Sequence, residues 1–181
     1  MIDIEKLYNE AETLFEKEDY ENAFNLFLKC AEKLDKESLY MVGFMYENAL
    51  GVEENYVQAF NYYKKAAEFK LPDALVAVGS LYENGLGTDV NYDEAFNSYH
   101  EAFKLGDIEA SFLLGYMYES GRGVETNYEL AFKYYYVAAE EKDYRACERL
   151  AYLYEKGLGV EQNIEESVKW KNLSKEYESL E

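Results

Sequence analysis

The chain has 181 residues, and its 37 acidic against 18 basic side chains give a formal net charge of −19 at pH 7. Phosphate binding requires positive side chains, so this charge argues against nucleic acid as a ligand. A hydrophobic share of 49% with a single proline indicates a folded, helix-rich chain and argues against a disordered acidic one. The negative charge either speeds the encounter with a basic peptide or protein, or serves solubility alone.

A tyrosine, and a glycine five residues after it, recur every 36 residues along most of the chain. The tyrosines are Tyr46, Tyr82, Tyr118 and Tyr154, and the glycines are Gly51, Gly87, Gly123 and Gly159. Apolar residues follow helical spacing on both sides of each glycine-bearing turn. Each copy is therefore predicted to be a helical hairpin that is stable only when stacked on its neighbours. The whole chain is predicted to be an all-α solenoid of about five antiparallel helix pairs.

Residues 1–36 form the first predicted helix pair and differ in plan from the rest. The segment from Ala11 to Ala23 is shorter than the segment from Gly43 to Ala59, which is the residue that aligns with Ala23. The first unit is therefore expected to lack the glycine-bearing loop. The remaining copies are predicted at 37–72, 73–108, 109–144 and 145–181.

A glycine is predicted to end the first helix of most copies. In the second copy this helix is expected to run from about Asp73 to Asn84 and to end at Gly85, because glycine adopts the left-handed conformation without a Cβ penalty. The same signal recurs at Gly121 and Gly157. The first copy has Ala49 at this position, so its turn is expected to be strained or differently shaped.

The second helices are predicted to begin at an asparagine. Asn91 with Glu94, and likewise Asn163 with Glu166, have the spacing of a capping box. In this motif the asparagine accepts from an orphan amide and the glutamate reaches back to the asparagine amide. In the last copy, Ser and Lys at 174–175 replace the paired alanines of earlier copies. Because a helix without a following neighbour needs no small residues, this helix is expected to be a terminal cap.

The cysteines and the apolar segments bear on location. Cys30 and Cys147 lie in different repeats, where they are poorly placed for a disulfide within one unit, and they are interpreted as buried apolar residues of a protein in a reducing compartment. No basic and apolar leader opens the chain, and no stretch of about 18 apolar residues occurs that would span a bilayer. A cytoplasmic protein is expected, with no membrane partner.

Several short motifs resemble metal or phosphate sites but fail at required positions. Asp89, Asn91 and Asp93 have the spacing that opens a calcium loop. Glu94, however, stands where a glycine is needed, and His100 stands where a bidentate glutamate is needed. The glycine pairs at the turns lack the third glycine and the Lys-Ser/Thr ending of a phosphate loop. One histidine and two separated cysteines do not assemble a zinc site or a Cys-His nucleophile. No metal site, cofactor or catalytic residue is therefore predicted.

The second and third copies carry the most specific pattern. In the second copy its residues are Ala74, Val78, Gly79, Tyr82, Gly85, Leu86, Gly87, Asn91, Ala95, Tyr99 and Ala102. In the third they are Ala110, Leu114, Gly115, Tyr118, Gly121, Arg122, Gly123, Val124, Ala131, Tyr135, Ala138 and Ala139.

On these residues the chain resembles the SEL-one-like repeat family, a branch of the tetratricopeptide superfamily, from residue 37 to about residue 175. The residues before them resemble an ordinary tetratricopeptide unit. The resemblance implies a right-handed superhelix of antiparallel helix pairs, with the first helices lining a concave face. It also implies an adaptor that holds other proteins and seldom carries chemistry.

On such a fold, the candidate binding residues are those of the first helices that packing does not require. Relative to Gly43, Gly79, Gly115 and Ala151, they are the positions three before and one, four and five after, which share one helix face. The candidates are Tyr40, Phe44, Glu47, Asn48, Val76, Ser80, Glu83, Asn84, Phe112, Tyr116, Glu119, Ser120, Glu148, Tyr152, Glu155 and Lys156.

Two features of these candidates leave alternatives open. The glutamates at 47, 83, 119 and 155 form a column that is either a solvated edge or a clamp for the Lys and Arg side chains of an extended peptide. The aromatic rings at 40, 44, 112 and 116 are either inter-helix packing or a patch that anchors a peptide.

The leading hypothesis is a non-catalytic, monomeric adaptor whose concave face binds a protein segment with basic residues and apolar anchors. The alternative is a structural spacer or self-assembly unit in a larger complex. An enzyme is a remote third option, because the sequence announces no convergent site.

Overall fold

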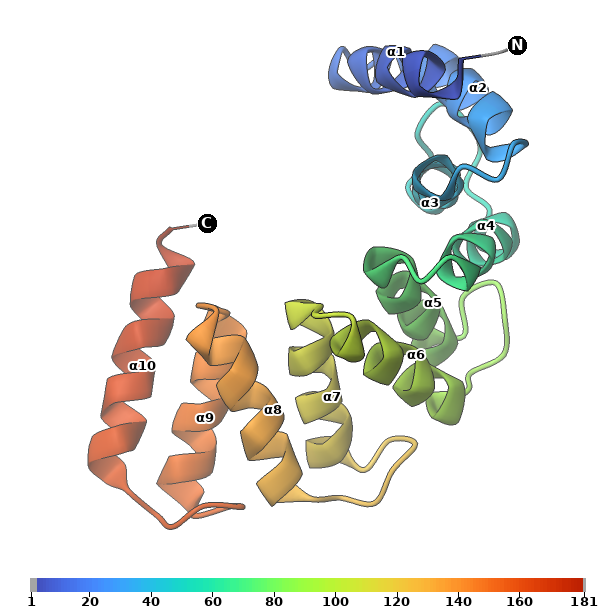
Figure 1. Ribbon diagram of the computed structural model, residues 1–181. Helices are drawn as coiled ribbons and strands as arrows, with labels where there is room; N and C mark the ends of the chain where they lie inside the picture. The colour runs from blue at the N-terminus through green and yellow to red at the C-terminus, as the bar shows by residue number, and fades with distance from the viewer. Residues whose placement is uncertain (1–2, 181) are drawn as a thin grey trace. The chain divides into compact units, whose positions relative to one another are not determined.

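The computed structural model describes residues 3–180, and within this range the chain forms ten α-helices and no β-strand (Figure 1). The helices are α1 (Ile4–Glu16), α2 (Tyr20–Ala31), α3 (Lys36–Glu47), α4 (Tyr56–Glu68), α5 (Pro72–Asn84), α6 (Tyr92–Lys104), α7 (Ile108–Ser120), α8 (Tyr128–Glu140), α9 (Tyr144–Lys156) and α10 (Ile164–Glu178). The predicted all-α fold of helical hairpins is confirmed. Over the same range, no helix has both the length and the apolar character needed to cross a membrane.

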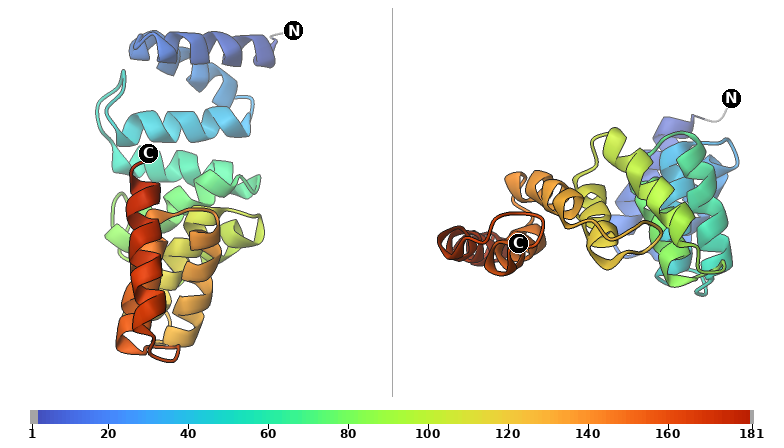
Figure 2. Two further views of the ribbon diagram at one scale, coloured as in Figure 1. Left: turned by 90° about the vertical axis from the view of Figure 1, so that its left-hand side faces the viewer. Right: turned by 90° about the horizontal axis from the view of Figure 1, so that it is seen from below.

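The chain divides into two units, which are described separately. Unit 1 comprises residues 1–91 with α1 to α5, and unit 2 comprises residues 92–181 with α6 to α10. Within each unit, consecutive helices pack against one another (Figures 1 and 2). Phe27 and Leu39 are among the side chains buried between the helices of unit 1, and Tyr135 and Leu150 are among those of unit 2. Burial is therefore spread along the helices of each unit, as repeat proteins require.

Acidic and amide side chains cap the helix N-termini in an alternating pattern. Aspartates cap first helices by accepting the backbone amide three residues later, and these are Asp3, Asp35, Asp107 and Asp143. Asparagines cap second helices in the same way, and these are Asn55, Asn127 and Asn163. Helix α5 begins instead with Pro72, one residue before the predicted start, because proline suits the first helical position.

The same asparagines also close each loop through their backbone N–H groups. Their own amides donate to the tyrosine carbonyls nine residues earlier, as Asn55 to Tyr46 (2.9 Å), Asn127 to Tyr118 (2.8 Å) and Asn163 to Tyr154 (3.0 Å). The amide of Asn163 is therefore already bonded, and Glu166 contacts Lys169 instead. The asparagine half of that predicted capping box forms, and the expected return bond from Glu166 is wrong.

The first helices end in the left-handed conformation that the glycines predict. Gly85, Gly121 and Gly157 have φ of 67°, 70° and 68°. Ala49, at the aligned position after α3, has φ of 54°. The left-handed residue is therefore kept with an alanine, which costs energy, so the expectation of strain holds. The end of the helix also differs, because α3 stops one aligned residue earlier, with Asn48 at its end.

The glycine five residues after the tyrosine of each loop makes a close approach to the preceding repeat. A Cβ added to Gly51 would lie 2.3 Å from the carbonyl oxygen of Tyr20, and one added to Gly159 would lie 2.2 Å from that of Tyr128. Gly87 and Gly123 approach Tyr56 and Tyr92 in the same way. Each loop thus sits directly on the first turn of the second helix of the repeat before it, where only glycine fits.

Candidate protein-binding face on the first helices

The sixteen predicted residues lie on the first helices or directly after them, eight in each unit. We call them the first-helix face. Unit 1 presents Tyr40, Phe44, Glu47 and Asn48 from α3 and its end, and Val76, Ser80, Glu83 and Asn84 from α5. Unit 2 presents Phe112, Tyr116, Glu119 and Ser120 from α7, and Glu148, Tyr152, Glu155 and Lys156 from α9.

A buried tyrosine from the second helix lies against the packing glycine of the first. A Cβ added to Gly43 would lie 2.7 Å from Cδ1 of Tyr63, and a Cβ added to Gly115 would lie 2.7 Å from Cδ1 of Tyr135. Both tyrosines are fully buried. The ring therefore occupies the space that any larger side chain would need, which explains the glycine column.

The hydroxyl groups of these two tyrosines reach the glutamate column. Tyr63 donates to Oε2 of Glu47 at 2.6 Å, and Tyr135 donates to Oε2 of Glu119 at 2.7 Å. Burial, and then the hydrogen bond to the carboxylate, raise the pKa of both phenols well above the ordinary value. A buried hydroxyl requires a partner, and the glutamate supplies it. Glu47 and Glu119 therefore accept hydrogen bonds from buried groups of the fold. The sequence had suggested only a solvated edge or a clamp for a peptide, and neither includes this role.

Glu119 also holds a cation of its own chain. Nε of Arg149 donates to Oε2 of Glu119 at 3.0 Å, and the NH2 group contacts Oε1, which makes a two-pronged ion pair. The side chain of Glu119 is only 12% exposed, whereas that of Arg149 is 38% exposed. The guanidinium carbon lies 4.9 Å from the ring centroid of Tyr152 on the same helix. The pair thus ties α7 to α9 and fixes one face of the guanidinium on an aromatic ring.

The last repeat changes two columns together. Lys171 stands where the earlier repeats have the buried tyrosine, and Ala151 stands where they have the packing glycine. Lys171 donates to Glu155 at 2.7 Å and Lys156 donates to it at 2.9 Å. These cations, Lys171 first, lower the pKa of Glu155 to about 2. Without a ring against the helix there is room for a methyl group, and the glutamate keeps a donor in the form of an ammonium.

The first repeat provides a further comparison. Phe15 on α1 aligns with the glutamate column, and Phe27 on α2 aligns with the tyrosine column. Their rings lie 6.5 Å apart, and Phe27 is fully buried. The carboxylate is thus replaced in the repeat that has no hydroxyl to satisfy. Across these repeats, the column holds a glutamate where the facing side chain is a donor and a phenylalanine where the facing side chain is apolar.

Three of the four aromatic candidates pack between helices. Tyr40 contacts the ring of Tyr63 with 5.4 Å between centroids, and Phe112 contacts that of Tyr135 with 5.6 Å. Phe44 lies 6.4 Å from the ring of Phe15. The fourth candidate, Tyr116, is 36% exposed, and Tyr152, which belongs to the same face, is 39% exposed.

All three arginines of the chain lie in unit 2, and each stands over an aromatic ring. Arg145 lies 4.5 Å from the centroid of Phe112, and Arg122 lies 5.2 Å from that of Tyr116. Together with Arg149, they are functional candidates that the sequence reasoning missed. A signal was present, because arginine is absent before residue 122 and two arginines lie one helical turn apart on α9.

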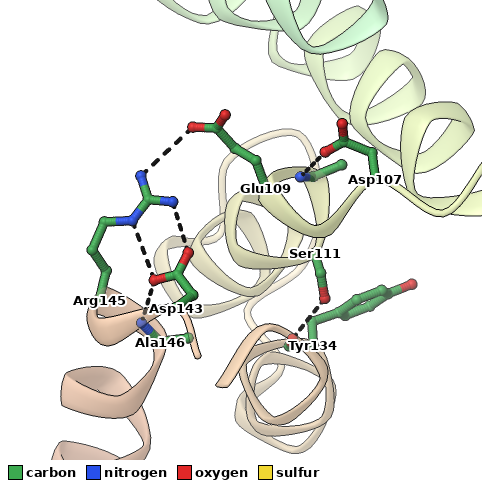
Figure 3. Close-up of polar contacts among 8 residues, drawn as sticks. Asp107, Glu109, Ser111, Tyr134, Asp143, Arg145 and Ala146 are labelled. Carbon is green, nitrogen blue, oxygen red and sulfur yellow. Dashed lines mark hydrogen bonds and ion pairs between the residues drawn. The ribbon is translucent and has the colours of Figure 1, made fainter. Parts of the chain in front are cut away.

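Arg145 joins the starts of two first helices (Figure 3). Its Nε and NH2 groups donate to Asp143 at 3.2 and 2.7 Å, and its NH1 group lies 3.6 Å from Oε1 of Glu109 on α7. Asp143 also caps α9 by accepting the amide of Ala146 at 3.0 Å. A single carboxylate therefore orders the helix start and orients the guanidinium over Phe112.

The small polar candidates bond mainly to their own helices. Asn48 donates to the carbonyl of Phe44 at 2.8 Å, Asn84 to that of Ser80 at 2.9 Å and Ser120 to that of Tyr116 at 2.8 Å. Val76 and Ser80 are half-buried, and Glu148 is exposed. Because these polar groups bond within their own helices, the groups that remain to select a partner are the exposed rings and charges.

Groups that often carry chemistry are packed within the fold. In the part of the chain that the structure describes, no three His, Cys, Asp or Glu side chains are grouped so as to hold a metal ion. Cys30 and Cys147 are buried and unpaired, and burial raises the pKa of the Cys147 thiol to about 11. His100 stacks on Phe96 with 5.7 Å between ring centroids.

The family model for the Sel1 repeat matches residues 8–33, 36–68, 72–107, 108–143 and 145–170. A Sel1 repeat protein from Oxalobacter formigenes is similar in structure, with a TM-score of 0.88 and 28% identity over 94% of this chain and 69% of that one. The protective antigen c5321 of uropathogenic Escherichia coli, which displays an SLR fold, has a TM-score of 0.86 and 30% identity over 97% of this chain. This chain spans 41% of its length.

Helicobacter pylori cysteine rich protein B is a further structural neighbour, with a TM-score of 0.56 and 25% identity over 71% of this chain and 92% of that one. A comparison with curated protein sequences gives no match. The repeat model covers all five helix pairs of the sequence, and the fold agrees with that of the neighbours. The chain belongs to the Sel1 repeat family.

Proposed function

We propose that this protein is a non-catalytic scaffold that binds a segment of another protein on the first-helix face of its units. Sel1 repeat proteins are generally protein-interaction scaffolds and are typically non-catalytic. For this chain, the observation that carries the proposal is the pair of exposed rings of Tyr116 and Tyr152, each beside an arginine. Rigid, amphipathic aromatic side chains of this kind supply much of the binding energy in protein interfaces.

The partner is basic and carries apolar anchors. The net charge of −19 gives the field that attracts such a segment, and exposed carboxylates such as Glu148 lie on the same helix as Tyr152. The glutamates at 47, 119 and 155 already bind donors of their own chain, so the attraction comes from the overall field and from other exposed acidic side chains. The protein acts as a monomer in the cytoplasm, where its two buried thiols stay reduced.

The direct test uses an array of short peptides that combine Lys or Arg with Leu or Trp, followed by titration of the best binder. Replacing Tyr116→Ala and Tyr152→Ala together is expected to weaken binding by about ten-fold or more, because two exposed anchors are lost. The matched control is Tyr136→Ala, since Tyr136 is also 39% exposed but lies on the second helix α8. Equal affinities for all three proteins would rule out this face.

The charge and the oligomeric state are tested in the same samples. Affinity for the basic peptide is expected to fall between about 50 mM and about 500 mM salt, because exposed charges more than a Debye length apart are screened. Double-stranded DNA is expected not to bind. Light scattering over a concentration series is expected to give one monomeric mass, and a mass that grows with concentration would favour a self-assembly unit instead.

A further inference from the structure

A surface groove of about 350 Å³ lies in unit 1, between the N-terminal end of α1 and the start of α3. Ile4, Glu5 and Tyr8 line it from α1, and Asp35 and Glu37 line it from the start of α3. The lining thus combines an isoleucine and a tyrosine ring with three carboxylates.

Further carboxylates lie near the tyrosine of this groove. Burial, and then Glu12, Asp35 and Glu37, raise the pKa of Tyr8 to about 12, so several carboxylates lie within electrostatic range of its hydroxyl. Lys36 reaches Glu37 at 3.3 Å, but the two side chains are 44% and 46% exposed, and such a pair contributes little. The first arginine of the sequence comes at residue 122, outside unit 1.

Unit 2 contains the same arrangement of residues at the equivalent place. The counterparts of the five groove residues, in the same order, are Ile108, Glu109, Phe112, Asp143 and Arg145. The three residues on the first helix are displaced by one constant spacing, and the two on the next helix by a slightly larger one, because the connection within the first repeat is shorter. Four of the five positions keep their chemistry, and the fifth changes from Glu37 to Arg145.

The unit 2 arrangement therefore shows how this set of side chains binds a guanidinium (Figure 3). Arg145 lies over Phe112 at 4.5 Å, forks onto the capping carboxylate of Asp143 and approaches Glu109. In unit 1, Asp35 is likewise the cap of its helix and accepts the amide of Ser38 at 2.8 Å. Tyr8 offers the ring and Glu5 the second carboxylate, while Glu37 adds a negative charge where unit 2 has its own cation.

From this internal counterpart we propose that the unit 1 groove binds an arginine side chain of the partner protein. This inference rests on the proposed function and names the residue that the basic segment inserts. The guanidinium stacks on Tyr8 and forks onto Asp35, with Glu5 and Glu37 beside it. A lysine fits less well, because its ammonium lacks the planar fork that pairs with a carboxylate and stacks on a ring.

The intervening first helices lack one part of this arrangement each. At the start of α5, Leu71 stands in place of the capping aspartate. On α5 itself, Val76 stands in place of the aromatic ring, although Asp107 caps the following helix. The ring and the capping carboxylate therefore occur together, without a resident arginine, at the groove of unit 1.

The test follows backbone amide NMR signals of the intact protein during titration with N-acetyl-arginine methylamide. Signals of residues 4–8 and 35–38 are expected to shift most. The neutral citrulline analogue and the lysine analogue are expected to bind at least about five-fold more weakly. Asp35→Asn with Glu37→Gln, which keeps a capping side chain, is expected to weaken arginine binding by about five-fold or more. Glu140→Gln with Glu141→Gln makes the same charge change at exposed positions and is expected to leave binding unchanged.

A second variant keeps the test decisive. Glu37→Arg recreates the unit 2 arrangement, so its own guanidinium is expected to occupy the groove and abolish binding of the probe, whereas Glu141→Arg is expected to leave it intact. Shifts spread evenly over the surface, or equal binding of the citrulline analogue, would overturn the proposal. Peptide binding that depends on Tyr116 and Tyr152 while the probe leaves residues 4–8 and 35–38 unmoved would overturn this inference and leave the proposed function standing. If neither the peptide binding nor the probe-induced shifts are observed, both the proposed function and this inference would be overturned.

Discussion

The hydroxyl of Tyr135 donates a 2.7 Å hydrogen bond to the carboxylate of Glu119, sixteen residues earlier on the neighbouring helix. The same spacing joins Tyr63 to Glu47 and Lys171 to Glu155. A column that looks like an exposed row of negative charge in the sequence is therefore, at these three positions, a set of acceptors for donors on the second helices. Contacts that stabilise the fold therefore lie on the same helix face that we propose for binding.

Removing the acceptor at Glu119 is expected to destabilise unit 2. Glu119→Ala leaves the buried hydroxyl of Tyr135 without its partner, which costs about 2 kcal/mol in the free energy of unfolding. Urea denaturation followed by circular dichroism measures this change. The control is Glu148→Ala on the exposed part of the face, which is expected to cost less than about 0.5 kcal/mol. Equal costs for the two variants would contradict an internal role for Glu119.

Stability is expected to fall in alkali. The folded state raises the pKa of Tyr63 and Tyr135 above the ordinary value of 10.0, chiefly through burial. Below pH 10 both states hold the phenol protons, and the stabilisation is complete. Above it the unfolded state releases protons that the folded state keeps, so the free energy of unfolding falls by about 1.4 kcal/mol per pH unit for each tyrosine. Urea titrations at several pH values from 9 upward measure the slope, and Tyr63→Phe with Tyr135→Phe is expected to reduce it.

A methyl group at the packing glycine is expected to be tolerated in the last repeat but not where a buried tyrosine faces it. Gly115→Ala places a Cβ 2.7 Å from the buried ring of Tyr135, and the clash is expected to cost about 1 to 3 kcal/mol despite the better helix propensity of alanine. Tyr135→Leu in the same background is expected to recover part of this loss, because the ring that causes the clash is gone. Ala151→Gly is the matched reverse change and is expected to cost only about 1 kcal/mol of helix propensity. Thermal unfolding of the four proteins decides the matter.

The alanine turn after α3 gives a prediction of opposite sign. Ala49→Gly is expected to stabilise the protein by about 0.5 to 1 kcal/mol, because φ is 54° there and glycine adopts this conformation without a Cβ penalty. Gly157→Ala, at the same turn of the last repeat with φ of 68°, is expected to destabilise it. The midpoints of urea denaturation compare the two variants with the parent, and an unstable Ala49→Gly protein would contradict strain at this turn.

The sequence was informative where a residue acts on its own backbone. Gly85 stops a helix and Asn163 starts one, so repeats of these residues predict the hairpins and their bounds to within a residue or two. The role of Glu47 could not be predicted in this way, because its partner lies on another helix and depends on how the two helices pack. Arg145 was missed for a related reason, since its column otherwise holds acidic residues and its contacts come from the preceding repeat.

Each loop glycine packs on the preceding helix pair, and this contact favours assembly from the N-terminus toward the C-terminus. Gly51 rests on the backbone of Tyr20 and Gly159 on that of Tyr128, so every new loop finds its support in residues made 31 positions earlier. During synthesis, each loop would leave the ribosome after the helix that supports it has been made. If an earlier helix pair is damaged, the next loop would lack the backbone on which it packs.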